Sequence, residues 1–365
     1  MQQRTNRQWI LQARPEGMVD PSLFELRETQ VAELAAGQVL AQTMYLSFDP
    51  TQRAWMAMDT YMPMVPLGEP MRAGGIAQVI ESRHAKFKPG DIVNYLCGWQ
   101  EYVVFEPGKS GLVPATKLPG HLDPALLLAL SLTGLTAYFG LLDIGKPKAG
   151  ETVLVSGAAG ATGSVAGQIA KLKGCRVIGI AGGAEKCAWL TNTAKFDAAI
   201  DYKNENVSDR LTALCPKGVV IYFDNVGGEM LDTVLLHVAQ NARIILCGAI
   251  SQYNNPEDMY GLKNYLSLII NRGRAQGFIV LDYLDRAIEG LLCLNKWIED
   301  GKLIQEIDMQ EGFDQVPSTL TRLFTGENLG KQLLKVCDAP LPLRSSPLEK
   351  AVFNIMSNYM VWRKG

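Results

Sequence analysis

The sequence predicts an α/β protein that consists of a doubly wound parallel sheet and a second, β-rich domain. From residue 151 onward, short apolar segments typical of buried strands alternate with segments of helical period. Residues 1–124 instead hold short apolar runs separated by proline and glycine, with no long helical period before Asp123. A chain of 365 residues is also long enough to form two cores rather than one.

The apolar segments of the second region set its expected elements. An apolar stretch from Asp123, the expected N-cap, to Asp143 predicts the first long helix. We expect strands at residues 152–156, 176–181, 198–200, 219–224, 243–248 and 276–280. We expect helices at residues 164–173, 185–194, 206–214, 229–239, 257–271, 282–301 and 313–325.

These elements divide the chain into three parts. The β-rich domain spans residues 1–124 and regains about 304–337, where KQLLKV (331–336) predicts a returning strand. The doubly wound domain spans residues 125–303.

A proline-rich linker opens a separate extension, residues 338–365, in which apolar side chains recur at helical spacing: Leu348, Val352, Ile355, Met356, Tyr359 and Trp362. A helix docked on its own chain is the simplest interpretation, and a dimer contact or a cover over the active site are the alternatives. A membrane-surface helix is disfavoured, because the segment has few basic residues, with Arg363 and Lys364 at its end.

Composition excludes several classes of function. The chain is 47% hydrophobic and 20% charged with a net charge of −2, so we expect no nucleic acid partner. It has no run of 18 apolar residues, and its N-terminal segment has no apolar core, so we expect no membrane span and a cytoplasmic location. The three histidines are far apart and no cysteine pair has CxxC spacing, so we expect no metal site.

The strongest local signal is a glycine-rich turn between a buried strand and a helix. In ETVLVSGAAGATGSVAGQIAKL the strand runs into Ala158-x-Gly160-x-x-Gly163. Ala158 stands where glycine is usual and is small enough for the turn, while Gly160 lets the backbone approach a pyrophosphate and Gly163 lets the helix pack closely. The helix N-terminus then presents N–H groups and the positive end of its dipole to the phosphates. Glycines are also common in turns that bind nothing. Here, however, the turn lies between a strand and a helix, and a second strand follows, which predicts a Rossmann dinucleotide-binding domain.

The end of the second strand indicates which dinucleotide is bound. NAD-specific sites place an acidic residue there to bind the ribose 2′-OH. Here the strand ends Ile180-Ala181-Gly182-Gly183 without a carboxylate, and Lys186 follows in the next helix. A lysine attracts the 2′-phosphate that an acidic residue would repel. Lys186 alone is equally compatible with a solvated helix charge, but the missing acid favours NADP(H).

Several longer motifs resemble one family of enzymes. They are GLTAYFGLLDIGKPKAGETVLVSGAAGATGS, GGAEKCAWL, IDYKN, IYFDNVGGEMLD, CGAISQYN, QGFIV and GENLGKQLLKV. In this order they resemble the zinc-independent medium-chain reductases, which include leukotriene B4 dehydrogenase/prostaglandin reductases, plant double-bond reductases and bacterial curcumin reductase-like enzymes. The resemblance covers about residues 8–337. It implies a GroES-like first domain, an NADP-binding Rossmann domain and a homodimer.

The resemblance also implies roles for matching residues. The pyrophosphate would be held by Gly160, Ala161, Thr162 and Gly163. Lys186 and Tyr202 would contact the 2′-phosphoadenosine end, and Asn225 the ribose. The loop beside the nicotinamide half would contain Cys247, Gly248, Ala249, Ile250, Ser251, Gln252 and Tyr253. Phe278 and Val280 would line the nicotinamide pocket, and Asn328 would contact the cofactor from the returning segment. FDNVGG and CGAISQYN follow predicted strands, where ligands of doubly wound sheets bind, but they are also compatible with ordinary strand-to-helix turns. Without the resemblance, Tyr202 and Asn328 are interpreted as surface polar residues.

The implied reaction is reduction of an activated carbon–carbon double bond. Hydride from NADPH would reach the β-carbon of an α,β-unsaturated carbonyl, and the site must then stabilise the enolate oxygen and protonate the α-carbon. Many relatives carry a tyrosine where this chain has Ile270, so the proton donor proposed there is absent. Tyr61, in TYMPMVPLGE, matches a tyrosine of the bacterial branch and is our candidate, with a cofactor hydroxyl, water, Tyr253 or Tyr265 as alternatives. Tyr61 is equally compatible with a loop aromatic that only shapes the pocket.

Two other functions remain open at this point. A quinone reductase of the same superfamily would use the same NADPH site with a different acceptor. A non-catalytic protein would keep NADPH as a stabilising ligand. Turnover of an enone separates the classes, because a binding protein never oxidises the cofactor.

Overall fold

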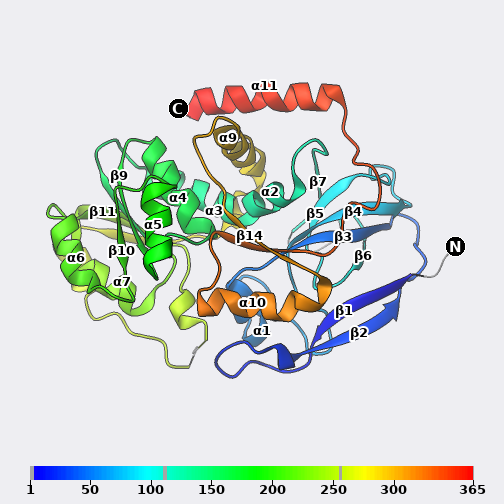
Figure 1. Cartoon of the computed structure of the whole chain (residues 1–365), viewed down its shortest axis with the longest axis horizontal. Coiled ribbons are helices and arrows are strands. Elements are labelled where there is room, and N and C mark those ends of the chain that lie inside the picture. The colour runs from blue at the N-terminus through cyan, green and yellow to red at the C-terminus, as the bar shows by residue number, and fades with distance from the viewer. Residues whose placement is uncertain (1–3, 110–112, 255–256, 365) are drawn as a thin grey trace. The chain divides into compact units, whose positions relative to one another are not determined.

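The computed structural model describes residues 4–109, 113–254 and 257–364 and confirms the predicted fold class (Figure 1). The chain forms two compact units, each assembled from separate segments. Unit 1 contains Met1–Ala129, Ile307–Asn328 and Gln332–Ile355. Unit 2 contains Leu130–Glu306, Leu329–Lys331 and Met356–Gly365. The C-terminal extension does not form a unit of its own, because its first part belongs to unit 1 and its last residues to unit 2.

Most strand pairs of unit 1 are antiparallel. Strands β1 (Thr5–Leu11) and β2 (Phe24–Gln30) pair with each other. A larger sheet has the order β14-β15-β3-β4-β5-β7, with β6 paired to β3. Its strands are β3 (Val39–Ser47), β4 (Gly75–Ser82), β5 (Ile92–Tyr95), β6 (Tyr102–Phe105), β7 (Thr116–Leu118), β14 (Ile307–Glu311) and β15 (Lys331–Lys335). The helices are α1 (Thr51–Ala57), α2 (Pro124–Ala129) and α10 (Val316–Thr325). The antiparallel pairing of β15 with β3 shows that the returning segment completes this sheet.

Unit 2 contains the doubly wound sheet. Its strand order is β10-β9-β8-β11-β12-β13, and all of its neighbouring strands are parallel. The strands are β8 (Thr152–Ser156), β9 (Arg176–Ala181), β10 (Ala198–Asp201), β11 (Val219–Asp224), β12 (Val238–Leu246) and β13 (Arg274–Gly277). The strand order reverses between β8 and β11, and ligands of such sheets bind at the carboxyl ends of the strands beside this reversal.

Helices connect these strands and supply the apolar layers beside the sheet. They are α3 (Leu135–Phe139), α4 (Ala161–Leu172), α5 (Ala184–Asn192), α6 (Val207–Leu214), α7 (Gly228–Leu235), α8 (Leu266–Ile270) and α9 (Ala287–Glu299). One core cluster joins strand residues such as Leu154, Ile178 and Tyr222 to Leu211 of α6 and Val234 of α7. Because both faces of the central strands are covered, they read as continuous apolar runs in the sequence.

Several expected elements differ from the structure. The strand expected at 243–248 lies at 238–246, and the helix expected at 282–301 is a 3-10 segment at 280–286 followed by α9. The helix expected at 257–271 is reduced to α8, because buried Asp232 accepts hydrogen bonds from the backbone amides of Lys263 (2.9 Å) and Asn264 (2.7 Å) and so fixes the preceding loop. The helix expected at 229–239 ends at Leu235, because Val238 already pairs with β11. The strand expected at 276–280 lies at 274–277, so Phe278 and Val280 follow it.

One stretch has the length and apolarity of a membrane span. Among the described residues, Pro124–Gly145 qualifies, with a mean hydropathy of 1.9, but 72% of its window is buried inside the protein. Asp123 begins it as expected, since its Oδ1 accepts a hydrogen bond from the amide of Ala125 (2.9 Å). The burial of this stretch is that of a core helix.

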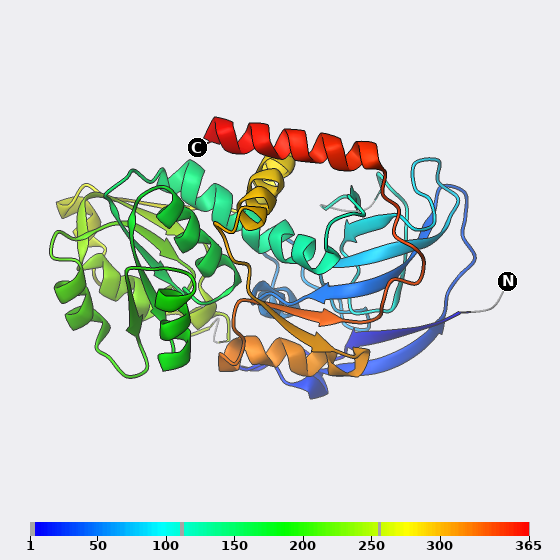
Figure 2. The same ribbon diagram turned by 45° about the horizontal axis from the view of Figure 1, so that its top comes forward.

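The C-terminal extension ends in α11 (Pro347–Lys364). Before it, Gln78 exchanges two 2.8 Å hydrogen bonds with the backbone of Leu341, which ties the linker to unit 1. Figure 2 shows α11 in red as one long helix, with α9 near its C-terminal half. The predicted terminal helix is therefore present.

Candidate functional site

The glycine-rich turn between β8 and α4 forms a cradle for an anion within unit 2. Gly157 has a φ of +57°, a conformation that favours glycine. A Cβ on Gly163 would lie 2.4 Å from the carbonyl oxygen of Gly157, so helix and turn approach as closely as glycine alone permits. No side chain caps α4, whose first turn is Ala161-Thr162-Gly163. These amides and the helix dipole suit a phosphate group.

The segment that returns to unit 2 lies against this turn. The amide of Gly330 donates a 2.9 Å hydrogen bond to the carbonyl oxygen of Ala159, and Gly330 forms a parallel bridge with Gly160. Gly330 has a φ of +72°, and a Cβ there would meet the carbonyl oxygen of Glu306 at 2.3 Å. Gly330, in the motif GENLGK, therefore borders the cradle.

The region after β9 has the features of a 2′-phosphate site. Two side chains of the loop that follows β10 pack directly against Gly182. A Cβ on Gly182 would be 2.9 Å from both Tyr202 Cε1 and Lys203 Cε. Lys186 lies in the first turn of α5, on the other side of Gly183. Lys203 and the exposed Tyr202 thus lie against a strand end that carries no carboxylate, and Lys186 follows it in the first turn of the next helix.

Asp201, whose carboxyl group contacts this region, is engaged in hydrogen bonds. Asp201 Oδ1 accepts hydrogen bonds from the amides of Gly183 (2.8 Å) and Lys203 (3.1 Å), and its Oδ2 from Asn204 Nδ2 (2.8 Å). The Gly183 amide, followed by the Asn204 side chain, lowers the pKa of this carboxyl. Asp201 therefore holds the loop that contains Lys203 and Asn204 against Gly183.

A buried carboxyl group organises the carboxyl ends of β8 and β11. Asp224 Oδ1 accepts hydrogen bonds from Ser156 Oγ (3.0 Å), Tyr222 Oη (2.8 Å) and the amides of Val226 and Gly227 (both 3.0 Å). Burial raises the pKa of Asp224, and the hydrogen bonds, with that from Gly227 first, oppose the rise. One oxygen atom thus fixes the turn after β11.

The two loops predicted to flank the ribose and nicotinamide meet at the backbone of Asp224. The Asp224 carbonyl oxygen accepts hydrogen bonds from the amides of Cys247 (2.9 Å) and Gly248 (3.1 Å). Asn225 Nδ2 donates to the carbonyl oxygen of Ser156 (2.7 Å), so this amide holds β8 and β11 together. Burial raises the pKa of the Cys247 thiol far above its ordinary value of 9.0, which keeps it protonated at neutral pH.

The rest of the predicted nicotinamide loop is also internally bonded. Tyr253 Oη accepts a 3.1 Å hydrogen bond from the amide of Ala249, and Ser251 Oγ donates to the carbonyl oxygen of Val226 (2.7 Å). The amide of Ile250 donates to the carbonyl oxygen of Asn225 (3.3 Å). These bonds hold the loop beside the turn that Asp224 fixes.

Phe278 and Val280 follow the carboxyl end of β13 in unit 2. A Cβ on Gly140 would lie 2.5 Å from Phe278 Cζ, so the ring is packed directly on the helix that contains Gly140. The ring also makes an edge contact with Tyr283, with centroids 6.4 Å apart. Val280 is buried. Both residues follow the carboxyl end of an edge strand.

Tyr61 and Asn328 belong to unit 1. The Tyr61 hydroxyl is 3.1 Å from Thr51 Oγ1, and its half-exposed ring makes an edge contact with Trp55, with centroids 6.3 Å apart. Arg72 lies over the Trp55 ring at 5.4 Å. Tyr61 therefore projects from a fixed aromatic support.

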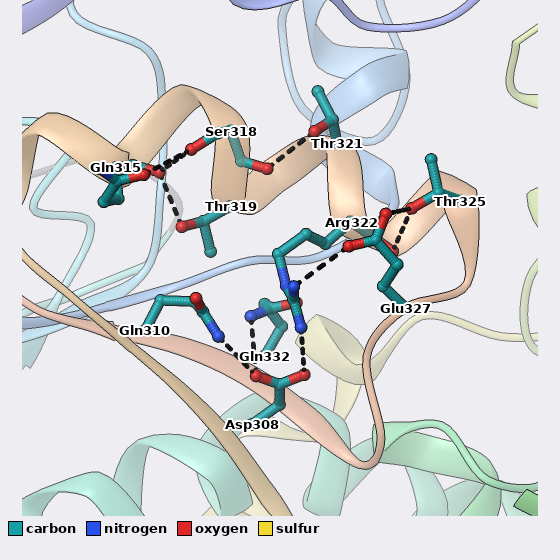
Figure 3. A network of polar contacts seen from close by, with 10 residues as sticks. All are labelled: Asp308, Gln310, Gln315, Ser318, Thr319, Thr321, Arg322, Thr325, Glu327 and Gln332. Atoms are coloured by element: carbon teal, nitrogen blue, oxygen red, sulfur yellow. Dashed lines mark hydrogen bonds and ion pairs between the residues drawn. The ribbon is translucent and has the colours of Figure 1, made fainter. Parts of the chain in front are cut away.

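The loop that carries Asn328 is anchored by a polar network (Figure 3). Arg322 of α10 contacts Asp308 of β14 at 2.9 Å and Glu327 at 3.1 Å. Glu327 also accepts a 2.8 Å hydrogen bond from Thr325 Oγ1. Because α10 ends at Gly326 in the left-handed region, with a φ of +71°, the chain turns and places Asn328 directly after this anchor.

Sequence reasoning missed Ser156, Asp224, Lys203 and Asp201. Each stands at or just after the carboxyl end of a strand in unit 2. A lone polar residue that ends an apolar strand was the available signal for Asp224 and Asp201. The partners of these residues come from neighbouring strands, and a single segment does not reveal them.

Two family models match the chain. Residues 7–113 match a model described as the N-terminal domain of oxidoreductase, and residues 161–294 one described as zinc-binding dehydrogenase. Despite the second description, no group of three or more His, Cys, Asp or Glu side chains suited to a metal occurs within the described ranges.

Curated relatives and solved structures match nearly end to end. The NADPH-dependent curcumin reductase of Escherichia coli (strain K12) is 40% identical and covers 92% of this chain and 98% of its own length. Prostaglandin reductase 1 of Rattus norvegicus is 39% identical, covering 90% and 98%. The crystal structure of CurA from Vibrio vulnificus in complex with NADPH has a TM-score of 0.85 at 38% identity, covering 91% and 99%. The chain therefore belongs to the family of medium-chain reductases that includes curcumin reductase and prostaglandin reductase 1.

Proposed function

We propose that this protein is an NADPH-dependent reductase of the activated carbon–carbon double bond in α,β-unsaturated carbonyl compounds. The observation that carries the proposal is the site in unit 2. It joins an uncapped, glycine-lined helix N-terminus to a strand end with two lysines and no carboxylate. The relatives named for NADPH-dependent curcumin reduction and prostaglandin reduction support the substrate class.

The protein's own residues bind and orient the cofactor in this proposal. The first turn of α4 and Gly160 hold the pyrophosphate, while Lys186, Lys203 and Tyr202 hold the 2′-phosphate. The turn after β11 and the loop 247–253, both fixed by Asp224, support the ribose and nicotinamide half, which Phe278, Val280 and Asn328 complete. Bound NADPH supplies a hydride to the β-carbon of the enone.

Tyr61 is the proposed hydroxyl donor to the substrate oxygen, where negative charge develops. Its contacts with Trp55 and Thr51 limit the positions of its phenol group. A pre-placed donor of this kind contributes about 10²–10³-fold to the rate. We expect Tyr61→Phe to lower kcat for an enone by that order and to leave the dissociation constant of NADPH unchanged. An unchanged kcat would make Tyr61 a wall of the pocket only.

The first experiment compares NADPH and NADH oxidation with a panel of 2-alkenals, 15-keto-prostaglandin-type enones, curcumin and a small quinone. We expect NADPH oxidation with a saturated-bond product from the enones. Oxidation with the quinone alone would indicate a quinone reductase. Fluorescence quenching of NADPH without any oxidation would indicate a binding protein.

Lysine variants test the cofactor assignment independently of the substrate. A lost charge-assisted contact costs about 1.5–3 kcal/mol, which is roughly 10- to 100-fold in affinity. We expect Lys186→Ala and Lys203→Ala to weaken NADPH binding by this order and to leave NADH binding unchanged. The control is Lys217→Ala, an exposed lysine before the amino end of β11. Equal weakening of NADH binding would show that neither lysine contacts the 2′-phosphate.

We also propose that two copies associate through the edge of the parallel sheet. Strand β13 ends the sheet, and all four of its residues are exposed. Leu266, Ile269 and Ile270 of the adjacent α8 are exposed as well. An open edge beside an apolar surface suits a two-fold symmetric contact. We expect Ile269→Glu to lower the sedimentation mass of the protein, and Leu172→Glu at the end of α4 to leave it unchanged. Equal masses would exclude this contact.

A further inference from the structure

The last helix carries its large apolar residues on the solvent side. Leu348, Val352, Ile355, Tyr359 and Trp362 of α11, here called the outer stripe, are 46–79% exposed. Their spacing alternates between four and three residues, which is the 3.5-residue repeat of a coiled-coil seam. In heptad terms, Leu348, Ile355 and Trp362 occupy d positions, and the other two occupy a positions. A single surface helix normally shows the reverse pattern, with its polar face outside.

The opposite face of α11 explains why the stripe points outward. Ser357, midway along the helix, is only 1% exposed, and Phe353 makes an edge contact with His121 at a centroid distance of 5.6 Å. The helix is therefore attached to the protein through a face centred on a small residue. The five large residues of the outer stripe are left for another partner.

The two relatives match 90–92% of this chain over 98% of their own length, and the motifs that resemble the family end near residue 337. The extension follows the last of these motifs. An exposed apolar stripe costs solubility unless something covers it.

We propose that α11 is an interaction surface for a second copy of this chain, and that the two helices pack antiparallel along their outer stripes. In this arrangement Ile355 of each copy packs beside Tyr359 of the other, and Val352 beside Trp362. The antiparallel alignment also opposes the two helix dipoles, which is favourable. The contact is symmetric and closed, as a two-fold operator requires.

Charge complementarity selects the antiparallel orientation. Glu349 and Arg363 both lie at e positions, next to the seam at its two ends. In an antiparallel pair e faces e, so Glu349 of each copy lies beside Arg363 of the other. In a parallel pair e faces g, and the g positions are Ala351 and Asn358, which carry no charge. The same helix has few basic residues to bind an anionic membrane surface.

Sedimentation velocity of the full chain tests the proposal. We expect Ile355→Glu to halve the mass at micromolar concentration, because a charge enters the centre of the seam. The matched control is Asn354→Glu, an exposed neighbour off the stripe, which we expect to keep the parent mass. Retained NADPH binding shows that each variant is folded. Since Ile269→Glu tests the separate contact at β13, the two variants identify which surface is responsible for any association.

A charge-reversal pair tests the orientation. We expect Glu349→Arg and Arg363→Glu each to weaken association up to about fivefold at low salt, and the double variant to restore it. Equal masses for the parent and Ile355→Glu would overturn the proposal. Binding of the parent, but not of Ile355→Glu, to phosphatidylserine vesicles without a change in mass would replace it with a membrane contact.

Discussion

Replacing Asp224 by alanine removes one acceptor that four donors share. The hydroxyls of Ser156 and Tyr222 rotate to other positions, but the backbone amides of Val226 and Gly227 are fixed in the turn. Each buried amide left without a partner costs about 1–3 kcal/mol. We therefore expect Asp224→Ala to lower the free energy of unfolding by about 2–6 kcal/mol. The turn at 225–227 loses its side-chain support, so NADPH binding weakens as well.

The asparagine variant separates hydrogen bonding from charge. Oδ1 of Asp224 accepts all four hydrogen bonds, while its Oδ2 is buried without a partner in the described part of the chain. The oxygen of an asparagine replaces Oδ1, and its nitrogen takes the position of Oδ2. Asp224→Asn also removes a buried charge. We expect its stability at pH 7 to equal or exceed that of the parent.

The pH dependence has a definite sign. Burial raises the pKa of Asp224 above its ordinary value of 3.8, so the folded protein holds this proton more tightly than the unfolded chain does. The parent therefore loses stability as the pH rises from below 3.8 through the raised pKa. Asp224→Asn has no such loss, so its advantage over the parent is larger at pH 7 than at pH 4.

Calorimetric melting temperatures between pH 4 and 8, with NADPH dissociation constants from fluorescence, measure these effects. The expected order of stability at pH 7 is asparagine variant, parent, alanine variant. An alanine variant as stable as the parent would show that the four hydrogen bonds do not hold the turn. An asparagine variant as damaged as the alanine variant would show that the negative charge itself is required.

Three further substitutions follow from contacts at the site. Gly163→Ala places a Cβ 2.4 Å from the Gly157 carbonyl oxygen, so we expect a loss of about 1–3 kcal/mol in unfolding free energy and weaker binding of both NADPH and NADH. Gly182→Ala displaces the side chains above it, which lie 2.9 Å from its Cβ position, and should weaken binding of NADPH but not of NADH. Arg322→Met releases the loop that carries Asn328; because the ion pairs are partly exposed, we expect a stability change below about 1 kcal/mol and about a fivefold rise in the KM for NADPH. An unchanged KM would separate this loop from cofactor binding.

The sequence by itself determined the buried strands and the glycine-rich turn. The strands at 152–156, 176–181 and 219–224 have the predicted bounds, because strands covered on both faces are continuous apolar runs. The turn from Gly157 to Gly163 was also readable, since its strained and close-packed positions accept glycine alone. Such signals are local, and a short segment contains all of their causes.

Only the tertiary structure decided the features that depend on distant partners. Asp232 holds residues 263 and 264 in a loop where helical period predicted a helix, because its buried carboxyl group binds their amides more effectively than a further helical turn would. Lys203 becomes a candidate for phosphate binding because the pairing of β10 with β9 places it over Gly182. Asp224 joins two loops because β8 and β11 are neighbours in the sheet although 68 residues separate Ser156 from Asp224. Strand pairing creates these contacts, and the pattern of a single segment does not contain them.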